Sequence, residues 1–371
     1  MKRKFTLITS FVLIILLSAT NLIAQTGEEN APLNEEQGPK LTIISGFQGG
    51  SNYQMALDIQ RMTRKTLGVP QYNTTTEMVP QMENGVAVME PSLEEGEDSV
   101  PVMVEKIEKI PTGDTIDFVK VLDSEGSYYN FLKVNKSNVD VAFLQYDVLL
   151  YESMQDLKRR YKVTDNIRVL LPMGTEQIHI ITLQPEGKKG ITSFSDLKKK
   201  RVGIGSSLMG TNITAKYIKE VTGSNWEDVE IPFDKSFKAL FNGSIDAFFF
   251  VGAKPVADLA NIPISMRDKI TLISIPADKA GKLDLAYEKV TITPEDYKWL
   301  SANVETYAVK ALLVTSVGGQ TPETEVALQK MLEIIKANKD NSANHPNWKT
   351  INFAKDDKID WEYYPAALKL F

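Results

Sequence analysis

The chain contains no cysteine among its 371 residues. Disulfide bonds, zinc–thiolate sites, iron–sulfur clusters and cysteine nucleophiles are therefore excluded. Histidine is almost as scarce, because only His179 and His345 occur. His179 lies in the apolar run IHIITL without a neighbouring partner for general-base chemistry, so we interpret it as a packed strand residue. His345 lies in a polar segment that reads as a loop.

The familiar catalytic motifs are also missing. No HExxH, GxSxG or Walker GxxxxGK[ST] pattern occurs. The run GIGSSLMG begins at Gly203 like a dinucleotide fingerprint, but Leu208 stands where the third glycine belongs. Glu176 is a single carboxylate without an obvious acidic partner, so a two-carboxylate mechanism is unsupported. We therefore predict a protein that is not an enzyme, with no cofactor and no metal site.

Basic residues are outnumbered, with 42 Lys and Arg against 48 Asp and Glu and a net charge of −6. This balance argues against nucleic acid or an anionic membrane surface as the main partner. A small anion can still bind locally, because helix dipoles act over one turn of backbone.

The N-terminus has the pattern of a secretory signal peptide. Basic residues at 2–4 precede the apolar run 5–17, and smaller residues continue to Ala24. The run is shorter than the ~20 apolar residues that span a bilayer, which disfavours the alternative of an uncleaved anchor. We predict a cleaved signal at 1–24, a flexible polar leader at 25–40, and a periplasmic protein.

Apolar strand patterns alternate with amphipathic helix patterns along the rest of the chain, which predicts α/β layers with mostly parallel sheets. In the helix after Ser51, Met55, Ile59 and Met62 share one face. The pattern also predicts two strands, Ile167–Leu171 and Ile178–Leu183, separated by a loop.

One segment, 71–115, departs from this alternation. Two alternating apolar runs surround an acidic turn near Glu94–Asp98, which indicates a β-hairpin, while a disordered acidic loop is the alternative.

Several polar residues stand where helices begin and are predicted to cap them. They are Ser51 or Asn52, Asp147, Thr211 and Asp234.

Glycine-containing polar loops follow three of the predicted strands. They are 45–53, 145–147 together with 174–177, and 205–211. Ligands of α/β sheets bind at such carboxyl ends of strands, and a helix N-terminus offers free N–H groups to an anion. The sequence therefore predicts a binding site rather than a catalytic site.

Five segments that follow one another along the chain carry a resemblance. They are ISGFQGGSNY, VDVAFLQYDVLLY, IRVLLPMGTEQIHIITL, ITSFSDLKKKRVGIGSSLMGT and NGSIDAFFFVGAKP. Together they resemble the TAXI-type solute receptors of TRAP transporters. The resemblance implies a two-lobed type II periplasmic binding protein fold, in which the lobes close on a small organic anion such as glutamate or 2-oxoglutarate, a dicarboxylate or amino acid, and deliver it to a TRAP-type membrane permease. A binding protein of an ABC importer and a ligand-sensing protein are the alternatives, and an extracytoplasmic enzyme is a third, weaker one.

The resemblance also implies lobes and contacts in this chain, which we expect to be a monomer. Lobe 1 would hold 41–177 with the excursion 71–115, lobe 2 would hold 178–275, and 276–371 would return to lobe 1 with the C-terminal helices. The implied ligand contacts are Gly50, Ser51, Tyr53, Gln145, Glu176, Ser206, Ser207, Gly210 and Thr211, with Gly252 and Pro255 at the cleft edge. Lys254 would supply a counter-charge if it faces the cleft, and is otherwise a solvated turn lysine.

The chain departs from the family pattern in two places near the site. Gln54 replaces the second tyrosine of the usual pair, and LPMGTE stands for the common LYPE, which shifts the expected position of Glu176. The excursion 71–115 has no counterpart in the family. These departures bear on the identity of the ligand more than on the fold.

Overall fold

The computed structural model describes residues 38–90, 99–185, 190–277, 281–353 and 359–371. The predicted signal peptide, nearly all of the predicted leader and the acidic turn near Glu94–Asp98 lie outside these residues.

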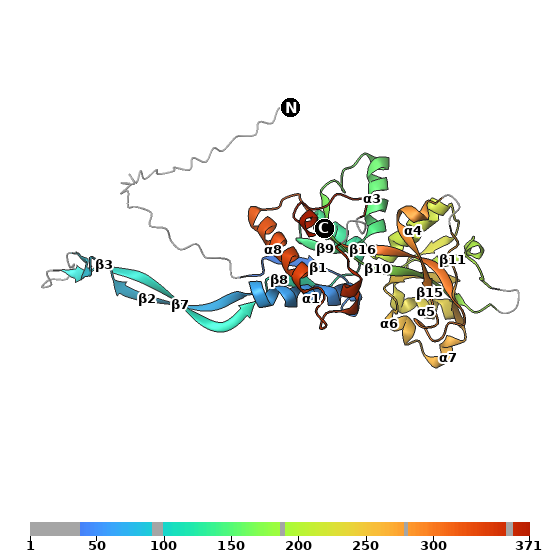
Figure 1. Ribbon diagram of the computed structural model, residues 1–371, viewed down its shortest axis with the longest axis horizontal. Helices are drawn as coiled ribbons and strands as arrows, with labels where there is room; N and C mark the ends of the chain where they lie inside the picture. The colour runs from blue at the N-terminus through green and yellow to red at the C-terminus, as the bar shows by residue number, and fades with distance from the viewer. Residues whose placement is uncertain (1–37, 91–98, 186–189, 278–280, 354–358) are drawn as a thin grey trace, which may run out of the picture. The chain divides into compact units, whose positions relative to one another are not determined.

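A ten-stranded mixed sheet forms the centre of the fold (Figure 1). Its path runs β12-β11-β13-β10-β16-β9-β1-β8, with β14 paired to β10 and β15 paired to β16. The strands are β1 (Leu41–Ile44), β8 (Val119–Leu122), β9 (Val141–Gln145), β10 (Ile167–Leu183), β11 (Arg201–Gly203), β12 (Glu227–Val229), β13 (Ala247–Gly252), β14 (Ile270–Leu272), β15 (Tyr287–Ile292) and β16 (Val304–Ser316).

The predicted α/β class is confirmed, and parallel pairing occurs at both ends of the sheet. Strand β1 pairs in parallel with β8 and β9, and β11 pairs in parallel with β12 and β13. The two long strands β10 and β16 instead pair antiparallel with each other and with β13 and β9. The sheet is therefore mixed as a whole, with two parallel groups joined by a central antiparallel pair.

Strand β10 corrects the prediction of two short strands and a loop. It runs without a break from Ile167 to Leu183, and its pairing with β16 shifts register between Val169 and Leu171 and again between Pro172 and Thr175. Proline lacks a backbone N–H and glycine packs weakly, so both are tolerated at such irregularities. The sequence signals of a loop at 172–177 therefore mark bulges within one strand.

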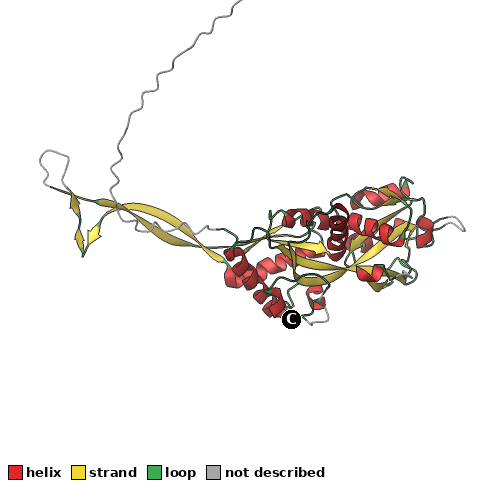
Figure 2. Ribbon diagram, turned by 90° about the horizontal axis from the view of Figure 1, so that it is seen from above, coloured by secondary structure: helices red, strands yellow, loops and turns green. Residues whose placement is uncertain are grey.

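In the part of the chain that the structure describes, helices pack against the sheet (Figure 2). The α-helices are α1 (Ser51–Leu67), α2 (Ser127–Asn135), α3 (Tyr146–Arg159), α4 (Gly210–Thr222), α5 (Phe233–Phe241), α6 (Ala257–Ala260), α7 (Ile264–Arg267) and α8 (Pro322–Asn338), and the 3-10 helices are η1 (Phe194–Leu197), η2 (Leu283–Leu285), η3 (Pro346–Thr350) and η5 (Ala367–Leu370). Helix α1 buries Met55, Ile59 and Met62, as its periodicity predicts. In the described part of the chain, no helix combines the length and the apolar character that a membrane span requires.

The predicted caps are wrong at all four helices. The N-cap residues are Gly50 for α1, Gln145 for α3, Met209 for α4 and Pro232 for α5, none of which caps with its side chain. Each helix begins at the polar residue expected to cap it or one residue before it. Those side chains can therefore contact other elements. Asp147 accepts hydrogen bonds from α4 and β15, and Thr211 accepts one from β13.

The segment 69–116 forms a β-hairpin, which confirms that alternative for its described residues. Strand β2 (Val69–Pro80) pairs antiparallel with β7 (Met103–Ile116), and two short pairs continue it: β3 (Met82–Glu83) with β4 (Val86–Ala87), and β5 (Met89–Glu90) with β6 (Val100–Pro101). Most of its side chains are exposed, including the apolar Met78, Met82, Val86, Met89, Met103, Ile107 and Ile110.

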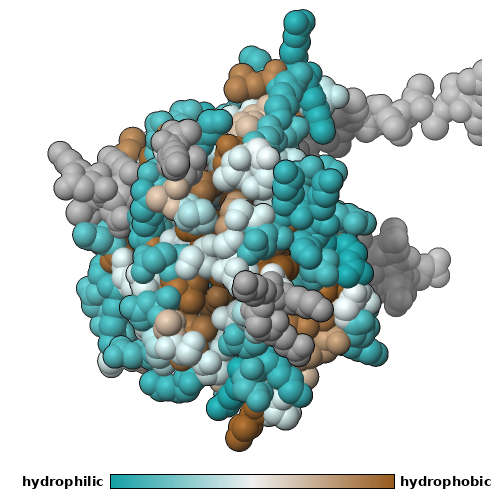
Figure 3. Space-filling model, turned by 90° about the vertical axis from the view of Figure 1, so that its right-hand side faces the viewer, coloured by the Kyte–Doolittle hydropathy of each residue, from teal (hydrophilic) through white to brown (hydrophobic). Residues whose placement is uncertain are grey.

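The face seen in Figure 3 is mostly hydrophilic, and hydrophobic residues gather on it only in patches. Apolar atoms contribute much of any protein surface, so such patches alone carry no function.

Candidate functional site

A cavity of about 390 Å³ collects residues from segments far apart in the sequence. The lining comes from the loop before α1, the turn before α2, the end of β9, the start of α4, the end of β13 and the turn that follows it. Eight of the predicted contacts line it: Gly50, Ser51, Gln145, Glu176, Gly210, Thr211, Gly252 and Pro255. Apart from Glu176, which lies within β10, these positions lie at strand ends, at helix starts and in the turn after β13, where the order of elements led us to expect a ligand.

The other four predicted contacts do not line this cavity. Tyr53 is half-buried on α1, Ser206 is half-buried, and Ser207 is exposed in the loop before α4. Lys254 is turned away from the cavity: its Nζ donates to the carbonyl of Thr291 at 2.7 Å and to Asp296 Oδ2 at 2.8 Å. Lys254 is therefore neither a cleft counter-charge nor a solvated lysine, because its ammonium is held in an ion pair.

Buried hydrogen bonds position the loop before α1 and the end of β9 against each other. The Asn130 side chain on α2 donates from Nδ2 to the carbonyls of Ser45 at 2.6 Å and Phe143 at 2.9 Å. Next along β9, the backbone N–H of Gln145 donates to Ser127 Oγ at 2.6 Å. Helix α2 thus fastens the two strand ends that carry the loop and Gln145.

Glu176 is one of the acids that line the cavity, and two amide side chains hold it. Asn52 donates from Nδ2 to Oε1 at 2.9 Å, and Gln145 donates from Nε2 to Oε2 at 2.6 Å. Burial raises the pKa of the Glu176 carboxyl, while these two hydrogen bonds act to lower it. One carboxylate therefore joins α1, β9 and β10 around the cavity.

Gly210 permits α4 to begin against Gln145. A Cβ at this position would lie 1.8 Å from Gln145 Oε1 and 2.9 Å from Ser127 Cβ, far inside contact distance. The next residue, Thr211, uses its hydroxyl as an acceptor for the backbone N–H of Val251 at 3.2 Å. The absent side chain at Gly210 and the inward hydroxyl of Thr211 bring α4, β9 and β13 to one cavity.

A second acid, Asp147, lies in the interior near Glu176. It is fully buried at the start of α3, and its Oδ2 accepts from Thr214 Oγ1 at 2.6 Å and from the Tyr287 hydroxyl at 2.9 Å. Burial, together with a smaller effect of the nearby charge of Glu176, raises the pKa of Asp147 to about 6, although the hydrogen bonds from Thr214 and Tyr287 act to lower it. The residue expected to cap α3 instead ties α3 to α4 and β15.

This raised pKa gives a prediction for Asp147→Asn. Because the folded pKa lies above the ordinary 3.8, the stability linked to protonated Asp147 is full below pH 4 and is lost as pH rises through about 6. The difference between the two pKa values corresponds to about 3 kcal/mol. We expect the variant to gain stability relative to the parent protein by that order between pH 4 and pH 7, measured by urea unfolding.

The comparison must be made between the two proteins, because His179 has the opposite effect. Burial lowers the pKa of His179 to about 4, so its contribution is present above pH 6.5 and is lost as pH falls. The contribution of His179 to the free energy of unfolding is the same in parent and variant, so it cancels when the two are subtracted. A difference that stays flat from pH 4 to pH 7 would contradict the role given to Asp147.

His179 is otherwise a packed strand residue, as predicted. It is fully buried on β10, and its Nε2 lies 2.8 Å from the hydroxyl of Tyr297. That hydroxyl also accepts the backbone N–H of Val256 at 3.0 Å, so Tyr297 connects His179 to the turn after β13. His179 therefore supports the turn after β13 and does not reach the cavity.

His345, placed in a loop by the sequence, lines the cavity. Its backbone N–H donates to Asp58 Oδ2 at 2.7 Å, and the indole N–H of buried Trp348 donates to the same oxygen at 2.9 Å. Burial lowers the pKa of the His345 imidazole, which favours its neutral form. The contact between α1 and η3 thus places a neutral imidazole at the cavity.

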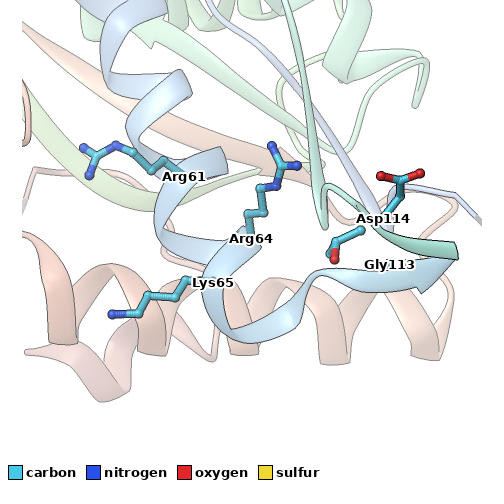
Figure 4. A pocket seen from close by; sticks show the side chains of 6 residues that line it. Arg61, Arg64, Lys65, Gly113 and Asp114 are labelled. Atoms are coloured by element: carbon cyan, nitrogen blue, oxygen red, sulfur yellow. The ribbon is translucent and has the colours of Figure 1, made fainter. Parts of the chain in front are cut away.

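A second depression of about 420 Å³, lined by Arg61, Arg64, Lys65 and 113–115, is a weaker candidate (Figure 4). The three basic side chains point in different directions. Arg61 is paired with Asp58 at 2.6 Å and Arg64 with Asp117 at 3.4 Å. No ligand group would meet these charges together, so we place the site at the first cavity.

The sequence missed several residues that line or hold the cavity. Asn52 follows the predicted contact Ser51, so the same loop contained its signal. Phe47, Met209 and His345 also line the cavity, but nothing in their local sequence distinguishes them. Within the described residues, no group of three or more His, Asp and Glu side chains could hold a metal ion.

Comparison with known proteins gives one family and several distant structural likenesses. The model of the NMT1-like family matches residues 103–352. Among solved structures, PhnD1 from Prochlorococcus marinus in complex with methylphosphonate is 12% identical, with 84% of this chain and 89% of that chain covered and a TM-score of 0.44. A protein from Bordetella bronchiseptica is 14% identical, with 81% and 70% covered and a TM-score of 0.41. An ancestral arginine-binding protein bound to arginine is 15% identical, with 60% and 76% covered and a TM-score of 0.33.

Proposed function

This chain belongs to the NMT1-like family, and we propose that it is a periplasmic receptor that binds one small solute and performs no catalysis on it. The observation that carries the proposal is the cavity, which polar groups from β9, β10, α1 and α4 line together. Its volume of about 390 Å³ is within the usual size of sites for small molecules.

The place of the cavity in the chain supports a two-lobed receptor. Gln145 and Glu176 belong to predicted lobe 1 (41–177), whereas Thr211 and Gly252 belong to predicted lobe 2 (178–275). The solute would therefore bind where the two lobes meet, and closure would be a shift of population driven by the solute.

We further propose delivery of the solute to a TRAP-type membrane permease. The five ordered segments that resemble TAXI-type receptors support this partner, and the signal-peptide pattern at 1–24 supports a periplasmic location. An ABC importer or a sensor could use the same cavity. A neighbouring gene for a fused multi-spanning TRAP permease would favour the first partner.

The solute class implied by the resemblance is a small organic anion, with glutamate and 2-oxoglutarate as examples. The start of α4 at Gly210 and Thr211 lines the cavity, and a helix N-terminus favours a carboxylate. The acidic side chains of the lining favour a positive group in the same solute.

A thermal-shift screen tests the proposed function. Purified protein freed of bound solute is heated with a panel of amino acids, amines and organic acids. A ligand that binds only the native state stabilises it by mass action, so at least one compound should raise the melting temperature. At a concentration one hundred times its Kd, that compound should raise the free energy of unfolding by about 2.7 kcal/mol. Native mass spectrometry of gently purified protein provides an independent readout through a co-purified solute. Folded, solute-free protein that responds to no member of the panel would contradict the receptor assignment.

A further inference from the structure

The charged side chains around the cavity have one sign. Glu125, Glu176 and Asp258 line it, and no lysine or arginine does so within the part of the chain that the structure describes. His345 is the other ionisable lining residue, and burial lowers its pKa, so it adds no positive charge near neutral pH. An acidic solute would therefore meet carboxylates without a side-chain cation to offset them.

Glu176 and Asp147 are the acids that most need a positive partner. The hydrogen-bond donors to Glu176 are the neutral amides of Asn52 and Gln145, and those to Asp147 are two hydroxyls and the backbone N–H of Val148, all of them uncharged. Among the described residues, no ion pair includes either acid. Lys254, close in sequence to the lining turn, is paired with Asp296. Two neighbouring carboxylates without a cation are costly to bury, so a bound positive group would stabilise them.

Gln145 supplies a third acceptor at the same place. Its Nε2 donates to Glu176, which leaves Oε1 as the free end of the amide. Oε1 is buried, has no partner among the described residues, and belongs to a side chain that is 5% exposed and lines the cavity. A buried acceptor of this kind destabilises the folded protein unless a donor reaches it.

We propose that the cavity recognises its solute through a protonated amine, which donates hydrogen bonds to Glu176 and to Gln145 Oε1. An ammonium group carries one positive charge, which offsets the carboxylate of Glu176, and three N–H donors, one of which can reach Gln145 Oε1. The inference rests on the proposed receptor function and narrows its solute class to amine-bearing compounds such as amino acids. It excludes the corresponding 2-oxo acids, although they have the same carboxylates.

Matched pairs of compounds test the amine requirement directly. Titration calorimetry on full-length mature protein compares each amino acid with its 2-oxo acid, such as glutamate with 2-oxoglutarate and alanine with pyruvate, and adds amines without a carboxylate. The binder should be an amine-bearing member, and its 2-oxo partner should bind at least about 100-fold more weakly, because charged hydrogen bonds to Glu176 are lost.

Glu176→Gln is the matched variant, since it keeps the shape of the side chain and removes its charge. The variant should bind the amine-bearing solute about 10–100-fold more weakly and leave the far-ultraviolet circular dichroism unchanged. Glu77→Gln is the control, because Glu77 is an exposed carboxylate of β2 that does not line the cavity, and its replacement should change affinity by less than about threefold.

Two other results would each overturn the inference and are distinguishable. In the first, a 2-oxo acid or dicarboxylate binds as tightly as its amino acid and Glu176→Gln has no effect on affinity. This result would reject the amine requirement and would leave the proposed receptor function intact. Absence of binding by every compound in both this titration and the broad screen removes the receptor function itself.

Discussion

Gly210→Ala is expected to destroy solute binding and to lower the free energy of unfolding by about 2–4 kcal/mol. The added Cβ would lie 1.8 Å from Gln145 Oε1 and 2.6 Å from its Cδ, so the Gln145 side chain must leave its position. Glu176 then loses the donor that lies 2.6 Å away. Loss of the ordered amide removes one acceptor of the proposed site and leaves a buried carboxylate with fewer partners.

Two variants separate this effect from a general intolerance of glycine replacement. Gly46→Ala also lies in the cavity lining, but its nearest contact would be Asn52 Cβ at 4.0 Å, so it should be close to neutral. Gln145→Ala removes the worst obstruction, so adding Gly210→Ala to it should cost clearly less than Gly210→Ala alone, with Ser127 Cβ at 2.9 Å as the remaining close contact. Urea unfolding and the thermal-shift response measure both effects. Equal costs of Gly210→Ala with and without Gln145 would show that the steric argument is incorrect.

Trp348→Ala is expected to cost about 3–5 kcal/mol of unfolding free energy, the largest stability loss that we predict for a single side chain. Trp348 is fully buried in η3, and its indole N–H donates to Asp58 Oδ2 at 2.9 Å. Truncation creates a large cavity and removes a donor from a buried carboxylate that also holds His345. Because His345 lines the binding cavity, the variant should also bind its solute more weakly.

Phenylalanine replacements distinguish the hydrogen bond from the packing. Trp348→Phe retains most of the ring and loses the donor, whereas Trp226→Phe loses an indole N–H that has no partner among the described residues. Trp226 is also buried, at 2% exposure, which makes the two sites comparable. The Trp348 variant should cost about 1 kcal/mol more than the Trp226 variant, by circular dichroism during urea unfolding. Equal costs would count against the importance of the bond to Asp58.

The α/β class, the apolar face of α1 and the packing of His179 could be predicted because each depends on a short-range pattern. Strand and helix periods and the burial of apolar runs act over a few residues. The continuous strand β10 could not be predicted, because Pro172 and Gly174 signal a break locally and only pairing with β16 along their length carries the strand across it. The caps failed for a related reason, since the first turns of these helices are set by what they pack against.

The binding site also has features that the sequence predicted and features that only the folded chain shows. The polar segments 145–147, 174–177 and 205–211 indicated this region from the sequence, and the resemblance to TAXI-type receptors implied Gln145, Glu176, Gly210 and Thr211 as contacts, all of which line the cavity. The sequence alone also excluded cysteine chemistry and the common catalytic motifs. Only the tertiary structure decided the charge that these residues present to a solute. It paired Lys254 with Asp296 outside the cavity and brought Asp147 near Glu176. Charge balance in a cavity depends on which groups meet across long sequence separations, and that arrangement is a property of the folded chain.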